Sequence, residues 1–323
     1  MKGKIPNRFI LMILFFGFSI NGFSWGFFAH QQINKMAVFC LPPELFGFYK
    51  THIDYITQHA VDPDKRRYMV KEEAAKHFID MDYYEKILPF DTLPRSFAKA
   101  AEKYSKDTLF MYGVVTWNVT WVLKDLTEAF RVKDVDRILK ISAEIGHYIA
   151  DAHVPLHSTS NYNGQQTQQQ GIHGFLESRL PELFSSDYDF FVGQATYVDN
   201  PLAAVWIAVE GSFACLDSIF GFEKSLQHQF KENQRYSFEH KGRNLIKVYS
   251  PEYAKAYHHK LQGMVERRMQ VAMLCVASFW YTAWVNAGQP ELGSFGSPKN
   301  SIEEKLPDLE LLFDQKMLGR EEY

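Results

Sequence analysis

The feature that most constrains this chain is Gly146–His157, a short histidine-rich segment that ends a long helical pattern. In the stretch before it, Asp134 to Ile145, apolar residues recur at the spacing of one helix face. His147 and Asp151 lie four residues apart, so their side chains share a face of the same helix. The segment therefore predicts a helix that presents an imidazole and a carboxylate together.

Further histidine and carboxylate residues follow this helix. Val154-Pro155 is expected to end it, because the residue before a proline disfavours the helical backbone, and His157 follows directly. His173 and Glu177 then form a second pair four residues apart, at the start of another helical pattern. Zinc in proteins is bound by histidine nitrogen and carboxylate oxygen. Two such pairs with a histidine between them indicate a zinc site.

The remaining sequence predicts an all-α fold. Apolar residues recur at helical spacing along most of the chain, and clear strand alternation is found in none of it. The other helical stretches expected are one that ends near Phe39, Glu44 to Ile56, Glu72 to His77, Ser96 to Phe130 (two helices), Pro201 to Phe220 and Pro251 to Ala287. No linker rich in Gly, Ser or Pro divides them. A single multi-helix domain is therefore expected over residues 25–287, followed by a polar tail over 288–323.

The first 24 residues are expected to be removed as a signal peptide. Three basic residues precede an apolar run, Phe9 to Ile20, and small residues precede a cleavage point after Ser24. The run is shorter than the ~20 apolar residues that a membrane span needs. The sequence therefore predicts a secreted or periplasmic protein that begins at Trp25 and has no transmembrane segment in its mature chain.

Charge and cysteine content narrow the function classes. The formal net charge is −3, and loss of the first 24 residues, with their three positive charges, lowers it to −6. An acidic surface argues against nonspecific binding of duplex nucleic acid, but not against a nucleotide or phospholipid substrate at a metal site. The cysteines, Cys40, Cys215 and Cys275, are too few for a disulfide framework. Buried thiols are expected, with a single bridge left open.

Two more histidines complete the candidate set: His30, five residues after Trp25, and His77, fifteen residues after Asp62. The resulting motifs are Trp-x4-His, Ala-x-Asp followed by His-Phe-Ile-Asp, Gly-His-x3-Asp-x5-His, and His-x3-Glu. In this order and spacing they resemble the zinc-dependent phospholipase C and single-strand nuclease superfamily. The resemblance covers about Trp25 to Glu177, and the chain beyond shares only a helical character with that family.

The resemblance implies a cluster of three zinc ions. The first would be held by Asp62, His77, His147 and one oxygen of Asp151. The second would be held by the amino nitrogen and carbonyl oxygen of Trp25, by His30 and by the other oxygen of Asp151. The third would be held by His157, His173 and Glu177. Asp64, two residues after Asp62, is expected to be a neighbour of the ligands or a solvated residue rather than a ligand.

The function implied by the resemblance is that of an exported zinc-dependent hydrolase of phosphodiester bonds. A water between two zinc ions has its pKa lowered toward neutrality. Asp151 would bridge two ions, and the second oxygen of Asp62 would orient the water or accept its proton. A competing hypothesis is a non-catalytic, zinc-stabilised binding module. Structural zinc sites are usually closed and rich in cysteine, which these candidate ligands are not. No stable protein partner is implied.

The substrate class stays open between nucleic acid and phospholipid. Phe78 and Asp80 resemble the nuclease residues that stack on a base and bond to its edge. Glu177 resembles the corresponding ligand of the phospholipases. The nuclease arginine that follows the aspartate ligand by three residues is Lys65 here, with Arg66 or Arg67 as substitutes.

Overall fold

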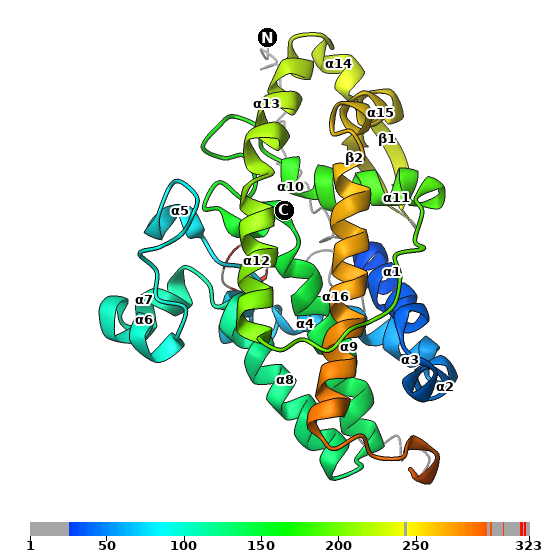
Figure 1. Ribbon diagram of the computed structural model, residues 1–323. Coiled ribbons are helices and arrows are strands. Elements are labelled where there is room, and N and C mark those ends of the chain that lie inside the picture. The colour runs from blue at the N-terminus through cyan, green and yellow to red at the C-terminus, as the bar shows by residue number, and fades with distance from the viewer. Residues whose placement is uncertain are drawn as a thin grey trace, which may run out of the picture.

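The computed structural model of the protein describes residues 26–241 and 244–295, together with 298, 306, 317–318 and 320. The expected signal peptide and the expected ligand Trp25 lie outside the described residues. Helices make up most of the described chain, which confirms the all-α prediction (Figure 1).

The α-helices are α1 (Phe27–Ala37), α2 (Pro43–Thr51), α3 (Ile53–Gln58), α4 (Asp62–Arg66), α5 (Met81–Tyr84), α6 (Phe97–Tyr104), α7 (Lys106–Met111), α8 (Val115–Arg131), α9 (Val135–Ala152), α10 (Ile172–Gly174), α11 (Leu180–Phe184), α12 (Pro201–Phe213), α13 (Leu216–Gln227), α14 (Glu232–Arg235), α15 (Pro251–Lys260) and α16 (Met264–Asn286). The 3-10 turns are η1 (Val38–Cys40), η2 (His59–Val61), η3 (Lys71–Lys76), η4 (Pro155–Ser158), η6 (Ser185–Asp187) and η7 (Leu292–Ser294), and η5 (Phe175–Arg179) is a π-helical turn. The strands are β1 (Tyr236–Lys241) and β2 (Asn244–Tyr249).

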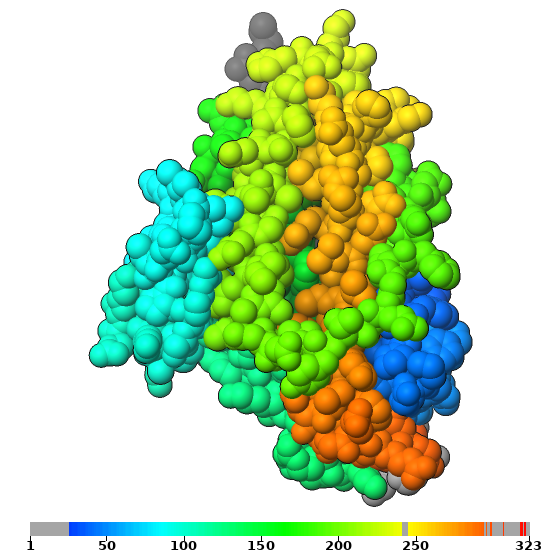
Figure 2. All heavy atoms as spheres, viewed as in Figure 1, coloured from blue at the N-terminus to red at the C-terminus, as the bar shows by residue number. Residues whose placement is uncertain are grey.

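The core closes around α9. α8 and α9 pack against each other, and α12 and α16 cross them on the face shown in Figure 2. Trp280 of α16 donates its indole N–H to the carbonyl of Ser142 in α9 at 3.0 Å, and its ring stacks on Tyr49 of α2 with 4.6 Å between ring centres. The Tyr49 hydroxyl lies 2.8 Å from Ser142 Oγ. These buried contacts join α2 and α16 to α9.

Residues with positive φ divide helical stretches that the sequence pattern predicts as longer. The stretch 96–130, expected to hold two helices, holds α6, α7 and most of α8, because φ is 71° at Ser105 and 90° at Gly113. The last stretch breaks into α15 and α16 at Gly263, where φ is 75°. A right-handed helix cannot continue through such a residue, so these breaks depend on backbone conformation rather than on hydrophobic pattern.

The sequence pattern does not predict the β-hairpin of the described chain. β1 pairs antiparallel with β2, with Tyr236 opposite Tyr249. Each strand is six residues long, and so short an alternation is easily missed. The Tyr249 ring stacks on Phe175 of η5, with 3.8 Å between ring centres, and the Tyr249 carbonyl accepts from Arg179 Nε at 3.0 Å. The hairpin thus supports the turn that carries Glu177.

Within the described chain, the stretch Pro201–Gln227 is long and apolar enough to cross a membrane by length and composition alone. The structure divides it into α12 and α13. The inner faces of these helices carry buried residues, among them Trp206 and Ile219. That the mature chain has no transmembrane segment stays a prediction.

The three cysteines are free thiols: Cys40 is buried, and Cys215 and Cys275 are half-buried. Cys40 and Cys215 lie close to the carbonyl four residues earlier, as weak thiol donors in helices do. Burial raises the pKa of Cys275 to about 12. Packing, rather than cross-linking, is therefore their role in the fold.

The approach of α1 to α9 positions the chemistry described below. Asn34 of α1 donates its side-chain amide to the carbonyl of Ala143 in α9 at 3.0 Å. The two helices come so close that a Cβ added at Gly146 would lie 2.0 Å from Asn34 Oδ1. His30 is one turn before Asn34, and His147 directly follows Gly146. Glycine at 146 therefore brings these two histidines together.

Gly146→Ala is expected to destabilise the protein by about 1–3 kcal/mol, the usual cost of overpacking a core. The added methyl must push Asn34 and α1 away from α9. Urea unfolding monitored by circular dichroism measures the change. Gly47→Ala is the matched control, because Gly47 is exposed on α2 and nothing lies within 4 Å of the added Cβ. It is expected to be neutral or to stabilise by up to about 1 kcal/mol. Equal effects of the two substitutions would show that the close approach is unimportant.

Candidate metal centre

Histidine and carboxylate side chains from distant parts of the chain gather in three buried groups. Within each group one ligand atom of every residue lies within 4.8 Å of the others. The groups are His30, His147 and Asp151; Asp64, His77 and His147; and His157, His173 and Glu177. Every one of these residues is at most 3% exposed. Burial at this level is costly for charged groups unless partners or a metal compensate them.

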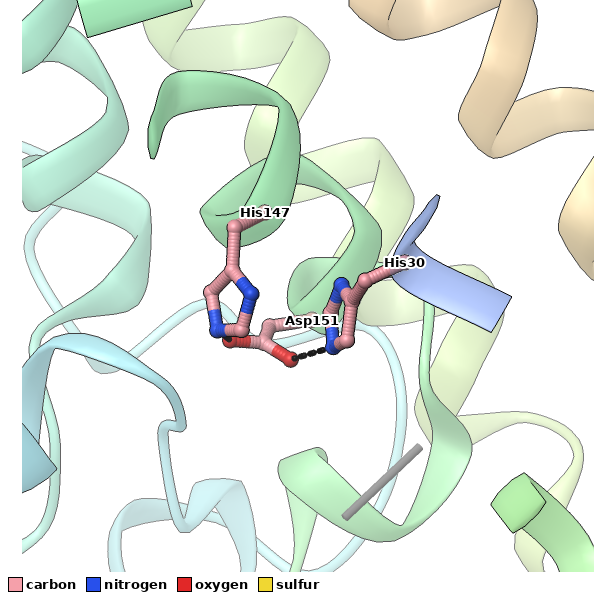
Figure 3. A group of neighbouring side chains, drawn as sticks. All are labelled: His30, His147 and Asp151. Atoms are coloured by element: carbon pink, nitrogen blue, oxygen red, sulfur yellow. Dashed lines mark ion pairs between the residues drawn. The ribbon is translucent and has the colours of Figure 1, made fainter. Parts of the chain in front are cut away.

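The first group joins α1 to α9. His30 enters from α1, and His147 and Asp151 come from one face of α9, as their spacing predicts (Figure 3). His30 Nε2 lies 3.4 Å from Asp151 Oδ1, and the rings of His30 and His147 stack with 3.9 Å between centres. His30 and Asp151 are the described residues of the predicted second zinc site, and His147, predicted for the first, joins them here.

The second group shares His147 with the first. His77 Nδ1 lies 3.0 Å from His147 Nε2 and 2.9 Å from Asp151 Oδ2. Asp64 Oδ1 lies 3.6 Å from His147 Nε2 and 3.7 Å from His77 Nδ1. Oδ2 of Asp64 is buried and makes no hydrogen bond within the described part of the chain. Asp151 directs one oxygen to each of the first two groups, which is the arrangement of a bridging carboxylate.

The third group is built from the turns that follow α9. His157 lies in η4, His173 in α10 and Glu177 in η5. His173 Nε2 lies 3.1 Å from Glu177 Oε2, and His157 Nε2 lies 3.6 Å from Glu177 Oε1. The structure thus brings together the three residues predicted for the third zinc ion.

Backbone carbonyls orient three of the histidines. Nδ1 of His147 donates to Ala60 O at 2.8 Å, Nδ1 of His157 to His77 O at 2.7 Å, and Nδ1 of His173 to Tyr162 O at 3.1 Å. Each bond fixes the Nδ1–H tautomer and leaves Nε2 toward its group. A hydrogen bond on the remote ring nitrogen is the usual support of a metal-ligating histidine.

The electrostatics of the cluster favour a cation. Burial alone would raise the pKa of Asp151, but the surrounding imidazoles, led by His147 and His157, hold it well below its ordinary value. Burial would lower the pKa of His77, yet its bonds to Asp151 and Glu73 raise it to about 9. Burial, followed by the nearby His147, lowers the pKa of His30. Positive charge is thus stabilised between the carboxylates, and His30 is kept in the neutral form that a metal requires.

Asp62, predicted as a ligand and as a catalytic carboxylate, lies elsewhere. Its Oδ2 is 2.5 Å from His59 Nδ1, its Oδ1 is 2.9 Å from Lys65 Nζ, and it belongs to none of the three groups. Asp64, expected only to be a neighbour, occupies the place instead. The two residues are two positions apart on the short helix α4, so their side chains leave it in different directions.

The replacement of Asp62 by Asp64 also changes which residue lies three positions after the aspartate. Counted from Asp64, the arginine three residues later is Arg67, whereas counting from Asp62 leads to Lys65. Arg67 is fully buried, and its Nη1 lies 3.8 Å from Asp64 Oδ1. Arg67 therefore holds, relative to Asp64, the position that the resemblance expects of an arginine relative to its aspartate ligand.

Glu73 is a functional neighbour that the sequence reading overlooks. It is fully buried, and its Oε1 lies 3.7 Å from His77 Nε2, the ring nitrogen remote from the second group. The Tyr148 hydroxyl donates to the same oxygen. Despite its burial, bonds from His77 lower the pKa of Glu73. Its position four residues before His77 is the same signal that revealed the other pairs.

Phe78 and Asp80, predicted to bind substrate, flank the third group. The amide of Ile79, between them, donates to the carbonyl of His157 at 2.9 Å, and the Asp80 amide donates to Tyr112 O at 2.7 Å. Phe78 is 3% exposed and Asp80 7% exposed. The guanidinium of Arg320, from the C-terminal part of the chain, lies against both.

Comparisons with known proteins add little to this geometry. The sequence matches no family model and no curated protein. Among solved structures, the alpha toxin from Clostridium absonum is similar, with 11% sequence identity and a TM-score of 0.45. The alignment covers 85% of this chain and 66% of the toxin chain.

Asp64→Asn is expected to lower the bound metal by about one ion per chain, because an amide is a far weaker ligand than a carboxylate. Elemental analysis of purified protein measures the change. Asp62→Asn is the matched control from the same short helix and is expected to leave the metal content unaltered. The opposite result, with Asp62→Asn losing metal and Asp64→Asn keeping it, would restore the ligand predicted from the sequence.

Proposed function

We propose that the protein is an exported zinc-dependent hydrolase of phosphodiester bonds. The observation that carries this proposal is Asp151, whose two oxygens face two adjacent groups of buried imidazoles, with a third His/carboxylate group alongside. A single structural ion needs no such arrangement. Cysteine, the usual ligand of closed structural zinc sites, is in none of the three groups.

The donor set fits zinc. Nitrogen of neutral imidazole and oxygen of carboxylate are both favourable zinc ligands. The second group would hold one ion through Asp64, His77, His147 and Asp151 Oδ2. The first would hold another through His30 and Asp151 Oδ1, and the third would hold one through His157, His173 and Glu177. When bound, zinc would supply Lewis-acid charge neutralisation and a water of lowered pKa.

The protein's own residues divide the remaining tasks. Asp151 sets the separation of the first two groups, and the carbonyl-bound histidines hold their Nε2 atoms in place. Asp64 replaces Asp62 as the carboxylate that orients water or accepts its proton, through the buried Oδ2. Arg67, next to Asp64, adds positive charge beside the second group.

We assign the amino terminus of the cleaved chain to the first group. Gly26, which precedes α1, is one helical turn before His30, so a chain that begins at Trp25 starts close to this group. A free amine is a nitrogen ligand only after the signal peptide is removed. The proposed enzyme is therefore active only in its exported form.

Of the two substrate classes, the residues beside the third group favour a nucleotide. Phe78 offers the face of an aromatic ring, and Asp80 offers a carboxylate that accepts hydrogen bonds. A base can stack on such a ring and donate to such an acceptor. A phospholipid headgroup such as choline has neither a flat ring nor an N–H group.

Hydrolysis of bis-p-nitrophenyl phosphate is expected to stop with a chelator and to return with added zinc, because all three groups need their ions. Asp151→Asn should lower kcat by at least about 100-fold, since it removes the bridging charge. His259→Gln, on the exposed face of α15, is the control and should leave the rate unchanged. Well-folded, zinc-loaded protein without activity on this ester, on single-stranded DNA or on phosphatidylcholine would support the non-catalytic binding module instead.

A variant with a methionine retained directly before Trp25 is expected to bind about one zinc ion fewer per chain than protein cleaved after Ser24. The extension replaces the terminal amine by a peptide nitrogen, which has no lone pair to offer. Elemental analysis reads out the metal, and N-terminal sequencing verifies both forms. Full metal content in the extended protein would refute the assignment of Trp25 as a ligand.

A further inference from the structure

Arg320, near the C-terminus, lies where the proposed substrate base would bind. Its guanidinium carbon is 4.1 Å from the centre of the Phe78 ring and 3.7 Å from the centre of the Tyr162 ring. The guanidinium therefore lies over both aromatic rings. The Arg320 side chain is only 7% exposed, which is unusual for an arginine in a polar tail.

The hydrogen bonds of Arg320 go to acceptors around the space beside the Phe78 and Tyr162 rings, which is the proposed substrate slot. Nη1 donates to Asp80 Oδ1 at 2.6 Å, and Nη2 donates to Thr159 O at 3.1 Å and to Leu156 O at 3.4 Å. The slot is thus walled by two aromatic faces and rimmed by a carboxylate and two carbonyls. It suits a planar group that carries several N–H donors.

The slot adjoins the metal groups through the chain itself. Phe78 directly follows His77, and Leu156 directly precedes His157. The carbonyl of Tyr162 accepts from His173 Nδ1. A group held in this slot therefore lies beside the second and third metal groups.

The backbone around Arg320 is anchored at two further points. The amide of Leu318 donates to the carbonyl of Arg67 at 2.9 Å, and Arg67 Nη2 donates to the carbonyl of Arg320 at 2.7 Å. Met317 is 8% exposed. Leu318 and Arg320 are therefore bound to the same arginine that lies beside Asp64.

We propose that Arg320 is an intramolecular ligand of the substrate slot, so that its side chain competes with substrate and must leave before a base can bind. The proposal rests on the proposed function for the identity of the substrate. The guanidinium and an amino-bearing base share the two features that the slot binds, a flat face and several N–H donors. An intramolecular occupant lowers the apparent affinity for an outside ligand by the fraction of time that the slot is free.

Arg320 does not act as a phosphate-binding arginine in this arrangement. Both of its Nη atoms donate to protein acceptors, Asp80 among them. A carboxylate 2.6 Å from Nη1 would also repel a phosphate there. Charge near the phosphate is better supplied by Arg67, on the side of the second group.

The test compares full-length, zinc-loaded protein with its Arg320→Ala variant by isothermal titration calorimetry. Deoxyadenosine 5′-monophosphate is expected to bind the variant at least about 10-fold more tightly, because the competitor is gone. Phosphocholine, which is rounder and has no N–H donor, is expected to gain no affinity. Leu318→Ala is the matched control, since its side chain is 39% exposed and its backbone bond to Arg67 needs no side chain. It should behave as the unaltered protein does.

Methylguanidinium separates this proposal from the nucleotide assignment. It should bind the Arg320→Ala variant and not the unaltered protein, and Phe78→Ala in the same variant should weaken it by about 10-fold. If methylguanidinium binds the variant but the nucleotide does not, the intramolecular ligand stands and the nucleotide substrate falls. If neither probe binds Arg320→Ala more tightly than the unaltered protein, the proposal is overturned. A lower melting temperature with unchanged affinities would make Arg320 a stabilising contact only.

Discussion

The structure depends on keeping several carboxylates and imidazoles out of water at once. Asp151 is 1% exposed, and ionised groups in such positions are stable only when each is paired or bound to a metal. The fold meets this requirement with elements that are far apart in sequence: α1, α4, α9 and the turns after α9 each send one or two side chains inward. Removing one partner leaves another buried charge uncompensated, so the groups act as a unit and set where these elements must lie.

Backbone geometry carries much of this arrangement. Gly146 lets α1 approach α9 closely enough for His30 to stack on His147. Gly113, with φ of 90°, lies so close to the Phe78 carbonyl that a Cβ would come within 2.1 Å of it. The first glycine places the first metal group, and the second places the strip of chain that runs from His77 to Asp80. Neither glycine bears a functional atom, yet each is as necessary to the site as a ligand.

Contacts between residues that are close in sequence could be predicted, and contacts between distant residues could not. His147 with Asp151, and His173 with Glu177, are pairs on single helical turns, so their spacing alone brings them together. Asp62 and Asp64 could not be told apart in this way, because both flank one proline and only the packing of α4 decides which of them faces inward. The hairpin was hidden by its shortness. Arg320 was out of reach, because its contact with Asp80 joins residues 240 positions apart.

The cluster combines buried carboxylates with arginines beside them. Its carboxylates, Asp64 and Asp151 among them, favour a divalent cation. The arginines are paired within the protein: Arg66 bonds to Glu73, and the fully buried Arg67 lies beside Asp64. Arg320 is paired in the same way, with its guanidinium on Asp80 and two carbonyls. Its positive charge is therefore paired with protein acceptors. This pairing distinguishes an occupant of the slot from a residue that binds substrate.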